Sequence, residues 1–311
     1  MNIGLIHDID LDGTGASIFI KNAVPLTTSE RCRYKDLDDV IYKMARHVDH
    51  LIVADLALES EQLKTVLKNY DHVTLFDHHE RSIPYSKLKQ NSHLSYNISL
   101  NQCSAALAYD YYKDKNGGNG YAALSALINV YDLWKTDHSA FPMAYDLNAL
   151  YWEYGYETFF AEFSDGFRPF KKSEKEFLAD LHTRKVQVLE DTAFYTLDSG
   201  SVVYLTEDKT FINDYTLHFK NYRVYYILRF DNYKKSYVAS CRLRRNHGYG
   251  DINLDKACTD AWKKGFISPD TIVSTGGHKE ATGIDFSSKA TIDDVKHFID
   301  VVDQYVTNQI S

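Results

Sequence analysis

Three short apolar runs in the first part of the chain lead into acidic residues. The runs occupy positions 3–6, 51–54 and 73–76, and the acids that follow them are Asp8, Asp55 and Asp77. Short apolar runs of this kind are typical of buried strands in a parallel sheet. In an open parallel sheet, ligands bind beyond the carboxyl ends of the strands, so we expect these acids to converge on one crevice. The pattern predicts an α/β fold with a charged site at one edge of its sheet.

The stretch after the first run concentrates charge, because His7, Asp8, Asp10 and Asp12 follow one another closely. Aspartate is also a common helix cap and turn residue, so this stretch alone is compatible with an ordinary turn. Carboxylates this close together repel one another unless a cation neutralises them. Since the two later runs repeat the arrangement, the stretch indicates a metal site.

The spacing of apolar residues divides the chain into two parts. Over roughly the first 160 residues, strands alternate with helical stretches, which is the pattern of a doubly wound α/β domain. A helical period then continues to about residue 191. After it the chain changes to short strand-like runs, two of which flank a hairpin turn at 231–234. We predict an N-terminal doubly wound, mainly parallel-sheet domain at 1–170, a connecting helix at 171–192 and a smaller α+β domain at 193–311.

Composition narrows the class of ligand. The chain has 311 residues, a hydrophobic fraction of 44% and a formal net charge of −8. The hydrophobic fraction permits a substantial core, whereas the acidic balance argues against binding long nucleic acid through many phosphate contacts. A short anionic substrate, held by a metal and a few basic groups, remains compatible with this charge.

The sequence also bears on location. The scattered cysteines fit a reducing compartment, where free thiols serve as small apolar side chains; they are Cys32, Cys103, Cys241 and Cys258. The chain opens directly on a strand, which leaves no room for a signal segment, and we find no apolar stretch near the roughly 18 residues that span a bilayer. We expect a cytoplasmic protein, monomeric or homodimeric, without membrane contact.

Two further motifs complete the pattern, namely Asp77-His78-His79 and Gly276-Gly277-His278 with the residues that follow. The chain resembles the DHH phosphoesterase superfamily, which is named for the Asp-His-His triplet. Within it, the chain is similar to the branch whose second domain, called DHHA1, carries a G-G-H-x-x-A-x-G element. Residues 276–283 match that element at every fixed position. The order of the motifs extends the resemblance over nearly the whole chain.

The resemblance implies a site for two divalent metal ions. The positions that match the family's ligands are Asp10, Asp12, Asp55, His78 and Asp132, with Asp55 at the bridging position. A set made mostly of carboxylates suits Mn²⁺ or Mg²⁺ better than structural zinc, which prefers thiolates. We therefore expect Mn²⁺, with Mg²⁺ as the alternative.

The first motif departs from the family's pattern and leaves one ligand open. Members usually open this motif with His two or four residues before the first Asp, or with Asp in the nuclease-like branch. Here His7 lies three residues before Asp10 and Asp8 lies two before it. Either can be the remaining ligand, and the other then orients a ligand or caps a turn. We favour His7, because imidazole is the commoner choice in the family.

The resemblance also assigns the triplet's other residues. It gives Asp77 the role of orienting the following imidazole by a hydrogen bond. His79 contacts the scissile phosphate or protonates the leaving oxygen, for which an imidazole has a suitable pKa near neutral pH. The alternative for His79 is a buried, hydrogen-bonded structural residue.

The second domain is expected to hold the rest of the substrate. Gly276 and Gly277 let the backbone approach an anion, and His278 bonds to phosphate or stacks beside a base. Arg242 and Arg244 lie in a run that resembles the family's strand with a phosphate-binding arginine. Both fall on the same side of a strand, so alternation cannot choose between them. We favour Arg244 for its place after Leu243.

The resemblance implies a metal-dependent phosphoesterase, of the nano-RNase type, that hydrolyses phosphodiester or terminal phosphate bonds of short oligonucleotides or dinucleotides. One alternative is a RecJ-like single-strand DNA 5′ exonuclease, which Asp8 favours, and another is a cyclic-dinucleotide phosphodiesterase. A nucleotide sensor without catalysis is the alternative from another class. The clustered acids argue against a sensor that has lost its metal, because unpaired acids in a cluster are costly.

Overall fold

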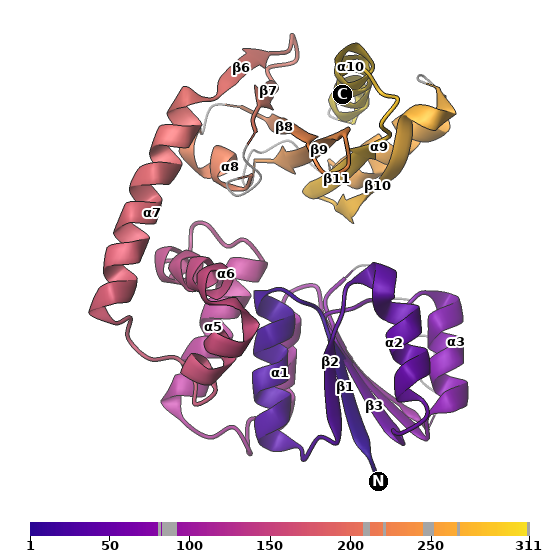
Figure 1. Cartoon of the computed structure of the whole chain (residues 1–311), viewed down its shortest axis with the longest axis vertical. Helices are drawn as coiled ribbons and strands as arrows, with labels where there is room; N and C mark the ends of the chain where they lie inside the picture. Colours follow the sequence, from indigo (N-terminus) through magenta and orange to yellow (C-terminus); the bar gives the residue numbers. More distant parts are fainter. Residues whose placement is uncertain are drawn as a thin grey trace. The chain divides into compact units, whose positions relative to one another are not determined.

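A computed structural model describes residues 1–79, 82, 92–207, 212–219, 222–244, 252–265 and 268–309. The chain divides into two compact units, Met1–Leu178 and Ala179–Ser311 (Figure 1). Helix α7 (Lys172–Asp191) includes the division between them. The predicted domain boundaries at 170 and 192 stay a prediction. Among the described helices, none is both long and apolar enough to cross a bilayer.

The first unit is built on a parallel sheet. Its described strands, in spatial order, are β2 (Thr28–Arg31), β1 (Ile3–His7), β3 (His50–Ala54), β4 (His72–Asp77) and β5 (Leu94–Ile98). All neighbouring pairs are parallel. This order is that of a doubly wound sheet, in which the chain changes direction between β1 and β3. The predicted α/β fold class is confirmed.

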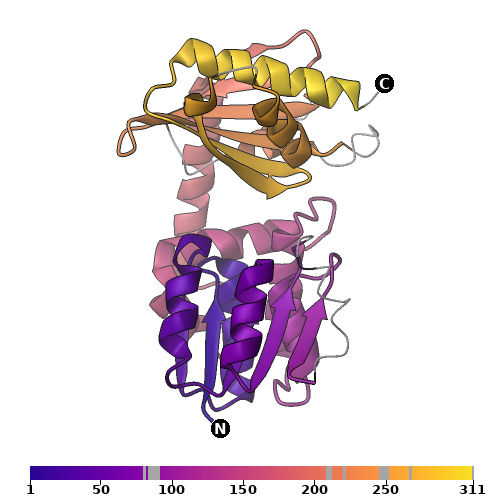
Figure 2. The ribbon, with the colours of Figure 1, turned by 90° about the vertical axis from the view of Figure 1, so that its right-hand side faces the viewer.

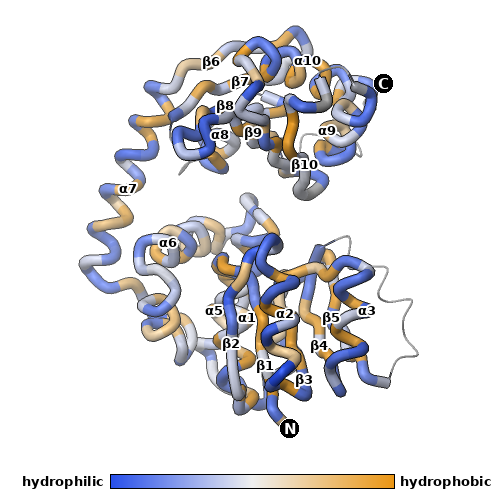
Figure 3. Tube along the Cα trace, turned by 45° about the vertical axis from the view of Figure 1, so that its right-hand side comes forward, coloured by the Kyte–Doolittle hydropathy of each residue, from blue (hydrophilic) through white to orange (hydrophobic). Residues whose placement is uncertain are grey.

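Helices cover both faces of this sheet. Helices α1 (Leu11–Ala23), α5 (Asn119–Asp132) and α6 (Phe141–Phe163) lie on one face, and α2 (Leu37–Met44) and α3 (Ser60–Asn69) on the other (Figures 1 and 2). Helix α4 (Ser104–Tyr112) packs against α1 and α5. Because both faces are covered, β1, β3 and β4 are apolar along most of their length (Figure 3).

The second unit is built on a mixed sheet. Its described strands, in spatial order, are β10 (Ile272–His278), β11 (Ala281–Phe286), β9 (Ser236–Leu243), β8 (Val224–Asp231), β7 (Val202–Leu205) and β6 (Ala193–Thr196). Strands β7 and β8 pair in parallel, and the other neighbours pair antiparallel. Helices α9 (Leu254–Lys263) and α10 (Ile292–Asn308) contribute to one core with this sheet, which includes Tyr226, Phe286 and Phe298. The short helix α8 (Asp214–His218) belongs to a second cluster with Tyr204 and Tyr225.

Candidate metal centre

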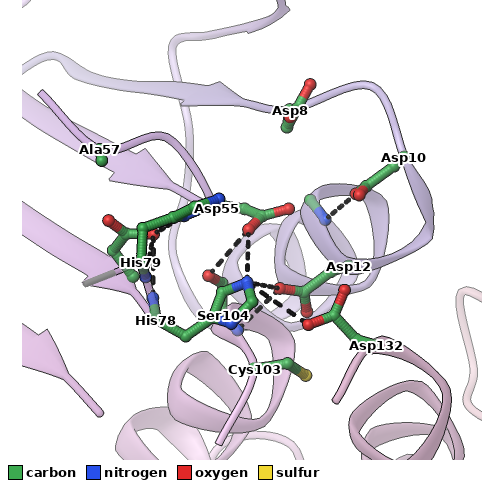
Figure 4. Close-up of polar contacts among 12 residues, drawn as sticks. Asp8, Asp10, Asp12, Asp55, Ala57, His78, His79, Cys103, Ser104 and Asp132 are labelled. Carbon is green, nitrogen blue, oxygen red and sulfur yellow. Dashed lines mark hydrogen bonds and ion pairs between the residues drawn. The ribbon is translucent and has the colours of Figure 1, made fainter. Parts of the chain in front are cut away.

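Acidic side chains gather where β1, β3 and β4 end, at the point where the strand order changes direction. They come from the β1–α1 loop, from α1 and α5, and from the residue after β3 (Figure 4). We call this set the acidic edge; it comprises Asp8, Asp10, Asp12, Asp55 and Asp132. Ligands of doubly wound folds bind at this point of the sheet. The convergence predicted from the three apolar runs is therefore what the first unit shows.

The β1–α1 loop is fixed by tight local contacts. Asp10 caps α1, and its carboxylate accepts a hydrogen bond of 2.9 Å from the backbone N–H of Gly13. A Cβ atom on Gly13 would lie 2.5 Å from the Asp8 carbonyl oxygen, so the loop can close this tightly only with glycine here. From α6, the hydroxyl of Tyr151 donates a hydrogen bond to the carbonyl oxygen of Ile9. These contacts hold the loop carboxylates in place without using their full ligand capacity.

Asp55 is placed by a change of backbone direction. Strand β3 ends at Ala54, and Asp55 adopts a left-handed φ of 61° while its N–H donates to the Phe76 carbonyl oxygen at 2.9 Å. This conformation is uncommon for a residue other than glycine, and such strain concentrates at functional sites. The side chain is buried. This backbone conformation directs the Asp55 carboxylate toward the edge of the sheet, and the surrounding packing must offset its conformational free-energy cost.

Asp12 joins the acidic edge to α4. Its two oxygens accept hydrogen bonds of 2.8 Å from the backbone N–H groups of Ser104 and Ala105, in the first turn of that helix. The positive end of the helix dipole favours the charged carboxylate. The Ser104 hydroxyl also donates to an oxygen of Asp55 at 3.3 Å. One short segment therefore orients two carboxylates that come from α1 and β3.

The imidazole of His78 lies among three of the carboxylates. Its Nε2 atom is 3.3 Å from an oxygen of Asp55, 3.4 Å from Asp132 and 3.8 Å from Asp12. Burial lowers the pKa of His78, which keeps the ring neutral near pH 7. Ligands about 2.1 Å from an octahedral cation lie roughly 3 Å apart. The His78 spacing therefore fits donors that share a divalent cation.

The pKa values of the acidic edge also indicate a site for a divalent cation. Burial raises the pKa of Asp55 well above its ordinary value, and the charges of Asp12 and Asp10 add to that effect. Burial, followed by the charge of Asp10, raises the pKa of Asp8 to about 6. Burial and the charge of Asp12 likewise raise the pKa of Asp10. Ligand oxygens of Asp8, Asp10 and Asp55 lie within 4.8 Å of one another, so these residues fit a divalent cation that offsets their repulsion.

The geometry also bears on the choice between His7 and Asp8. The Nδ1–H of His7 donates to the Asp8 carbonyl oxygen at 2.8 Å, and its buried Nε2 has no hydrogen-bond partner among the described residues. Burial lowers the pKa of His7 to about 3, and Lys21 and Arg31 act in the same direction. The ring lies 5.7 Å from that of Tyr156, and His7 belongs to none of the ligand groups found over the described parts of the chain. Asp8 shares a ligand group with Asp10 and Asp55, whereas the neutral ring and open Nε2 of His7 are compatible with a ligand, so the preference for His7 stays a prediction and Asp8 is the alternative.

Asp77 holds the ring of His79. One carboxylate oxygen of Asp77 accepts from His79 Nδ1 at 2.7 Å and from the His78 backbone N–H at 2.9 Å. The other oxygen accepts from the buried hydroxyl of Ser82. Although burial opposes ionisation, the hydrogen bonds from His79 and Ser82 keep the pKa of Asp77 below its ordinary value. Asp77 therefore stays an anion and fixes the orientation of His79.

Sequence reasoning missed three residues at this centre. Ser82 and Ser104 bond to carboxylates that the motifs did identify. Cys103 is buried, and its sulfur and oxygens of Asp12 and Asp132 all lie within 4.8 Å of one another. Cys103 and Ser104 lie at the start of α4, and no motif marks them. Only the packing of α4 against α1 brings them to the acidic edge.

Comparison with known proteins rests on structure alone. No protein-family model matches the sequence, and no curated protein is significantly similar to it. The structure is similar to the DHH domain of a protein described as a member of a family of ribosomal proteins, with a TM-score of 0.63, 16% identity, and coverage of 97% of this chain and 86% of that one. The chain has the DHH/DHHA1 fold.

Two other structures share the DHH/DHHA1 fold. An exopolyphosphatase-related protein from Bacteroides fragilis gives a TM-score of 0.59 at 13% identity, over 100% of this chain and 94% of that one. Exonuclease RecJ bound to manganese gives a TM-score of 0.52 at 16% identity, over 98% of this chain and 90% of that one. The expected superfamily fold is confirmed. At these identities the likeness concerns the fold.

In the second unit, the Gly-Gly-His motif lies in a strand. Gly276, Gly277 and His278 end β10 and pair with β11. A Cβ atom on Gly276 would meet nothing within 4 Å, whereas one on Gly277 would lie 2.3 Å from the Ala281 carbonyl oxygen. Gly276 therefore faces open space and Gly277 is required by packing. The side chain of His278 lies outside the described residues.

The register of the sheet separates the two candidate arginines. Arg242 on β9 pairs with Ala281, which pairs with His278 on β10, so the three occupy one row. Its guanidinium donates to the side-chain oxygen of Asn213 at 2.8 Å and to the Cys241 carbonyl oxygen at 3.0 Å. Arg244 lies beyond the end of β9 and outside this row. We therefore favour Arg242 over the predicted Arg244 as the arginine beside the glycine motif.

Proposed function

We propose that this chain is a metal-dependent phosphoesterase that hydrolyses phosphodiester, or terminal phosphate, bonds of short oligonucleotides or dinucleotides. The observation that carries the proposal is the position of His78 Nε2, within 3.8 Å of carboxylates on three separate elements. A buried neutral imidazole among buried acids is a donor set for a divalent cation, and a carboxylate-rich set favours Mn²⁺ or Mg²⁺. A manganese-bound exonuclease with the same fold supports this choice.

Two cation positions follow from the donors. Asp8, Asp10 and Asp55 would hold one, and Asp12, His78 and Asp132 would hold the other. An oxygen of Asp55 also lies 3.3 Å from His78 Nε2. A pair of bound divalent cations supplies an activated water at neutral pH and stabilises the charge that develops on phosphorus. Asp12 is held by α4 and Asp55 by its backbone turn, so both donors are oriented before a cation binds.

His79 is the residue placed to move a proton. Asp77 holds its Nδ1 at 2.7 Å, which fixes the orientation of the ring, and His79 lies close to Asp55 and His78. An imidazole in this position can deliver a proton to the leaving oxygen and take one back from water. Ser82 fixes the other oxygen of Asp77 and so helps to set the orientation of that pair.

Substrate size is inferred from charge and from the second unit. A net charge of −8 disfavours a long polyanion. Gly276 offers open backbone, and Arg242 offers a cation two positions along, in the row of His278, so the second unit by itself has groups that could bind one phosphate or nucleotide. These features favour a substrate of two or a few nucleotides.

A second candidate is a RecJ-like exonuclease acting on single-stranded DNA. The specific observation in its favour is that Asp8 lies within the group formed with Asp10 and Asp55. The acidic net charge argues against it. The length of the preferred substrate distinguishes the two candidates.

The test is a panel of substrates assayed with Mn²⁺ and with Mg²⁺. It comprises dinucleotide RNA, dinucleotide DNA, cyclic dinucleotides, adenosine 3′,5′-bisphosphate, pyrophosphate and a long single strand. We expect turnover of dinucleotides or of the bisphosphate, abolished by chelation and absent in Asp55→Asn. Preference for the long strand would replace the proposal by the exonuclease. Metal binding without turnover of any substrate would favour the sensor.

A further inference from the structure

Cys103 lies at the centre of the first unit, yet the proposed reaction does not use it. It precedes α4, is fully buried, and its backbone N–H donates to the side-chain oxygen of Asn129 at 2.9 Å. This contact fixes the residue directly beside Ser104, which bonds to the acidic edge. Figure 4 shows the side chain of Cys103 next to those of Asp12 and Asp132.

The donors around Cys103 differ in kind from those at the other end of the acidic edge. Asp8, Asp10 and Asp55 offer oxygen only. Oxygens of Asp12 and Asp132 lie within 4.8 Å of the Cys103 sulfur. The Nε2 atom of His78 lies within 3.8 Å of an oxygen of each of these two aspartates. The second group therefore offers oxygen, nitrogen and sulfur. Hard cations such as Mn²⁺ and Mg²⁺ prefer oxygen, whereas thiolate and imidazole favour Zn²⁺.

We propose that Cys103 is a ligand and that the two cation positions are chemically unequal. The position formed by Asp12, His78, Asp132 and Cys103 prefers Zn²⁺ or a cation of similar softness, and the all-oxygen position prefers Mn²⁺ or Mg²⁺. This inference rests on the proposed function, because the same carboxylates and imidazole hold the cations. On binding, the S–H bond breaks, its proton leaves to solvent and a sulfur–metal bond forms, without a change of oxidation state.

The separation of the donors is compatible with such a site. In a tetrahedral zinc site, sulfur and oxygen ligands lie roughly 3.6 Å apart. The donor atoms of Cys103, Asp12 and Asp132 lie within 4.8 Å of one another, so small side-chain rotations bring these three into range. The alternative is that Cys103 only fills space, as buried thiols often do. Cys32 is the matched comparison, because it is also buried and close enough to Asp8 for that charge to raise its pKa, yet it joins no ligand group in the described chain.

The experiment titrates the metal-free full chain with Co²⁺ and, separately, Cd²⁺, and records the near-ultraviolet absorption that arises when a thiolate binds either ion. We expect this band in the natural protein and in Cys32→Ser, and its loss in Cys103→Ser and Cys103→Ala. The Cys103 variants should still bind Co²⁺ through the remaining donors. Their Zn²⁺ affinity should fall at least roughly tenfold, since even groups that only orient ligands contribute 10–100-fold.

Metal content gives a second measurement that does not depend on turnover. After equilibration with equal Mn²⁺ and Zn²⁺, the ratio of bound Zn²⁺ to bound Mn²⁺ should be higher in the natural protein than in Cys103→Ser, because a thiolate ligand adds to the general preference of such sites for Zn²⁺. A band that persists in Cys103→Ser, or Co²⁺ binding to the natural protein without a band, would overturn the inference alone. Absence of any cation binding to the natural protein would overturn the proposed function as well.

Discussion

At the acidic edge of the first unit, charged side chains are buried and the backbone is strained, whereas β10 of the second unit presents glycine to open space. Asp55 combines burial with a left-handed φ of 61°. Gly276 has no atom within 4 Å of the position of a Cβ. Buried carboxylates with shifted pKa values are concentrated at functional sites. A glycine backbone in open space can come close to a ligand. The comparison leads us to expect that variants of the acidic edge lower kcat and that variants beside β10 raise KM.

The strongest test of this comparison is Asp55→Asn. Asparagine tolerates the left-handed conformation, so the backbone is retained while one negative charge is removed. We expect kcat to fall by roughly a thousandfold or more, because stabilisation by the cation pair is worth several kcal/mol. The measurements are steady-state kinetics and calorimetric metal binding. Unchanged kcat with normal metal content would remove Asp55 from the centre.

The next test concerns His79 and Ser82, which bonds to the Asp77 carboxylate that holds the His79 ring. His79→Ala should lower kcat by about a hundredfold or more for nucleotide substrates, since a proton donor contributes on this scale. Ser82→Ala should lower kcat by a smaller factor, because Asp77 still holds the ring. Both losses should shrink with p-nitrophenyl phosphoesters, whose leaving group needs no proton. Equal losses on both kinds of substrate would show that His79 has a structural role instead.

The variants Asp8→Asn and His7→Gln test which of these two residues in the first unit is a metal ligand. If Asp8 is the ligand, its variant should bind Mn²⁺ roughly 10–100-fold more weakly, and His7→Gln should bind it normally. The reason is that Asp8 shares a ligand group with Asp10, while the His7 ring lies against Tyr156. Isothermal titration decides the matter. Weak binding only in the His7 variant would confirm the preference drawn from the family pattern.

Arg242→Ala, with Arg244→Ala as the control, tests the second unit. Loss of a charge-assisted hydrogen bond to phosphate is worth about 1.5–3 kcal/mol, so KM should rise by roughly tenfold or more with little change in kcat. Arg244→Ala should leave both constants nearly unchanged, because Arg244 lies outside the row of the glycine motif. A larger effect from Arg244 would reverse the assignment. A fall in kcat alone would break the proposed division between the two regions.

The smallest expected effect concerns stability and pH. In the metal-free protein, burial and the charge of Asp10 raise the pKa of Asp8 from 3.8 to about 6, so between these values the folded state holds a proton that the unfolded state has released. Stability should therefore fall as pH rises through this window, with a shift of roughly 2–4 °C in Tm for each kcal/mol. Thermal unfolding with and without Mn²⁺ measures this, and Mn²⁺ should remove most of the fall. Asp214→Asn controls for the Asp214 carboxyl, whose pKa burial also raises, to about 7.

Burial decided which strands could be predicted from the sequence. Strands β1, β3 and β4 are apolar because helices cover both faces of the sheet, and the runs at 3–6, 51–54 and 73–76 revealed them. Strands β2 and β5 were missed, since they lie at the sheet's edges and their residues are partly exposed. Helices α9 and α10 each bury one face of apolar residues at helical spacing, a pattern that can be read along the chain.

The same reasoning applies to the candidate centre. The acids after the strands could be named because a parallel sheet gathers its strand ends at one edge. The roles of Ser82, Ser104 and Cys103 could not, because each depends on a contact made across the fold. Choosing Arg242 over Arg244 required the register of β9 and β11, which alternation along one strand leaves open.

The sequence by itself determined the buried strands, the doubly wound class and the set of acids that a cation must neutralise. Those properties follow from periodicity and from charge, which are local in the chain. Only the tertiary structure decided which donors share a cation, that Asp77 holds His79, and that a thiol lies beside Asp12 and Asp132. The physical reason is that coordination and hydrogen bonding act over a few ångströms, and the packing of α1, α4 and α5 sets those distances.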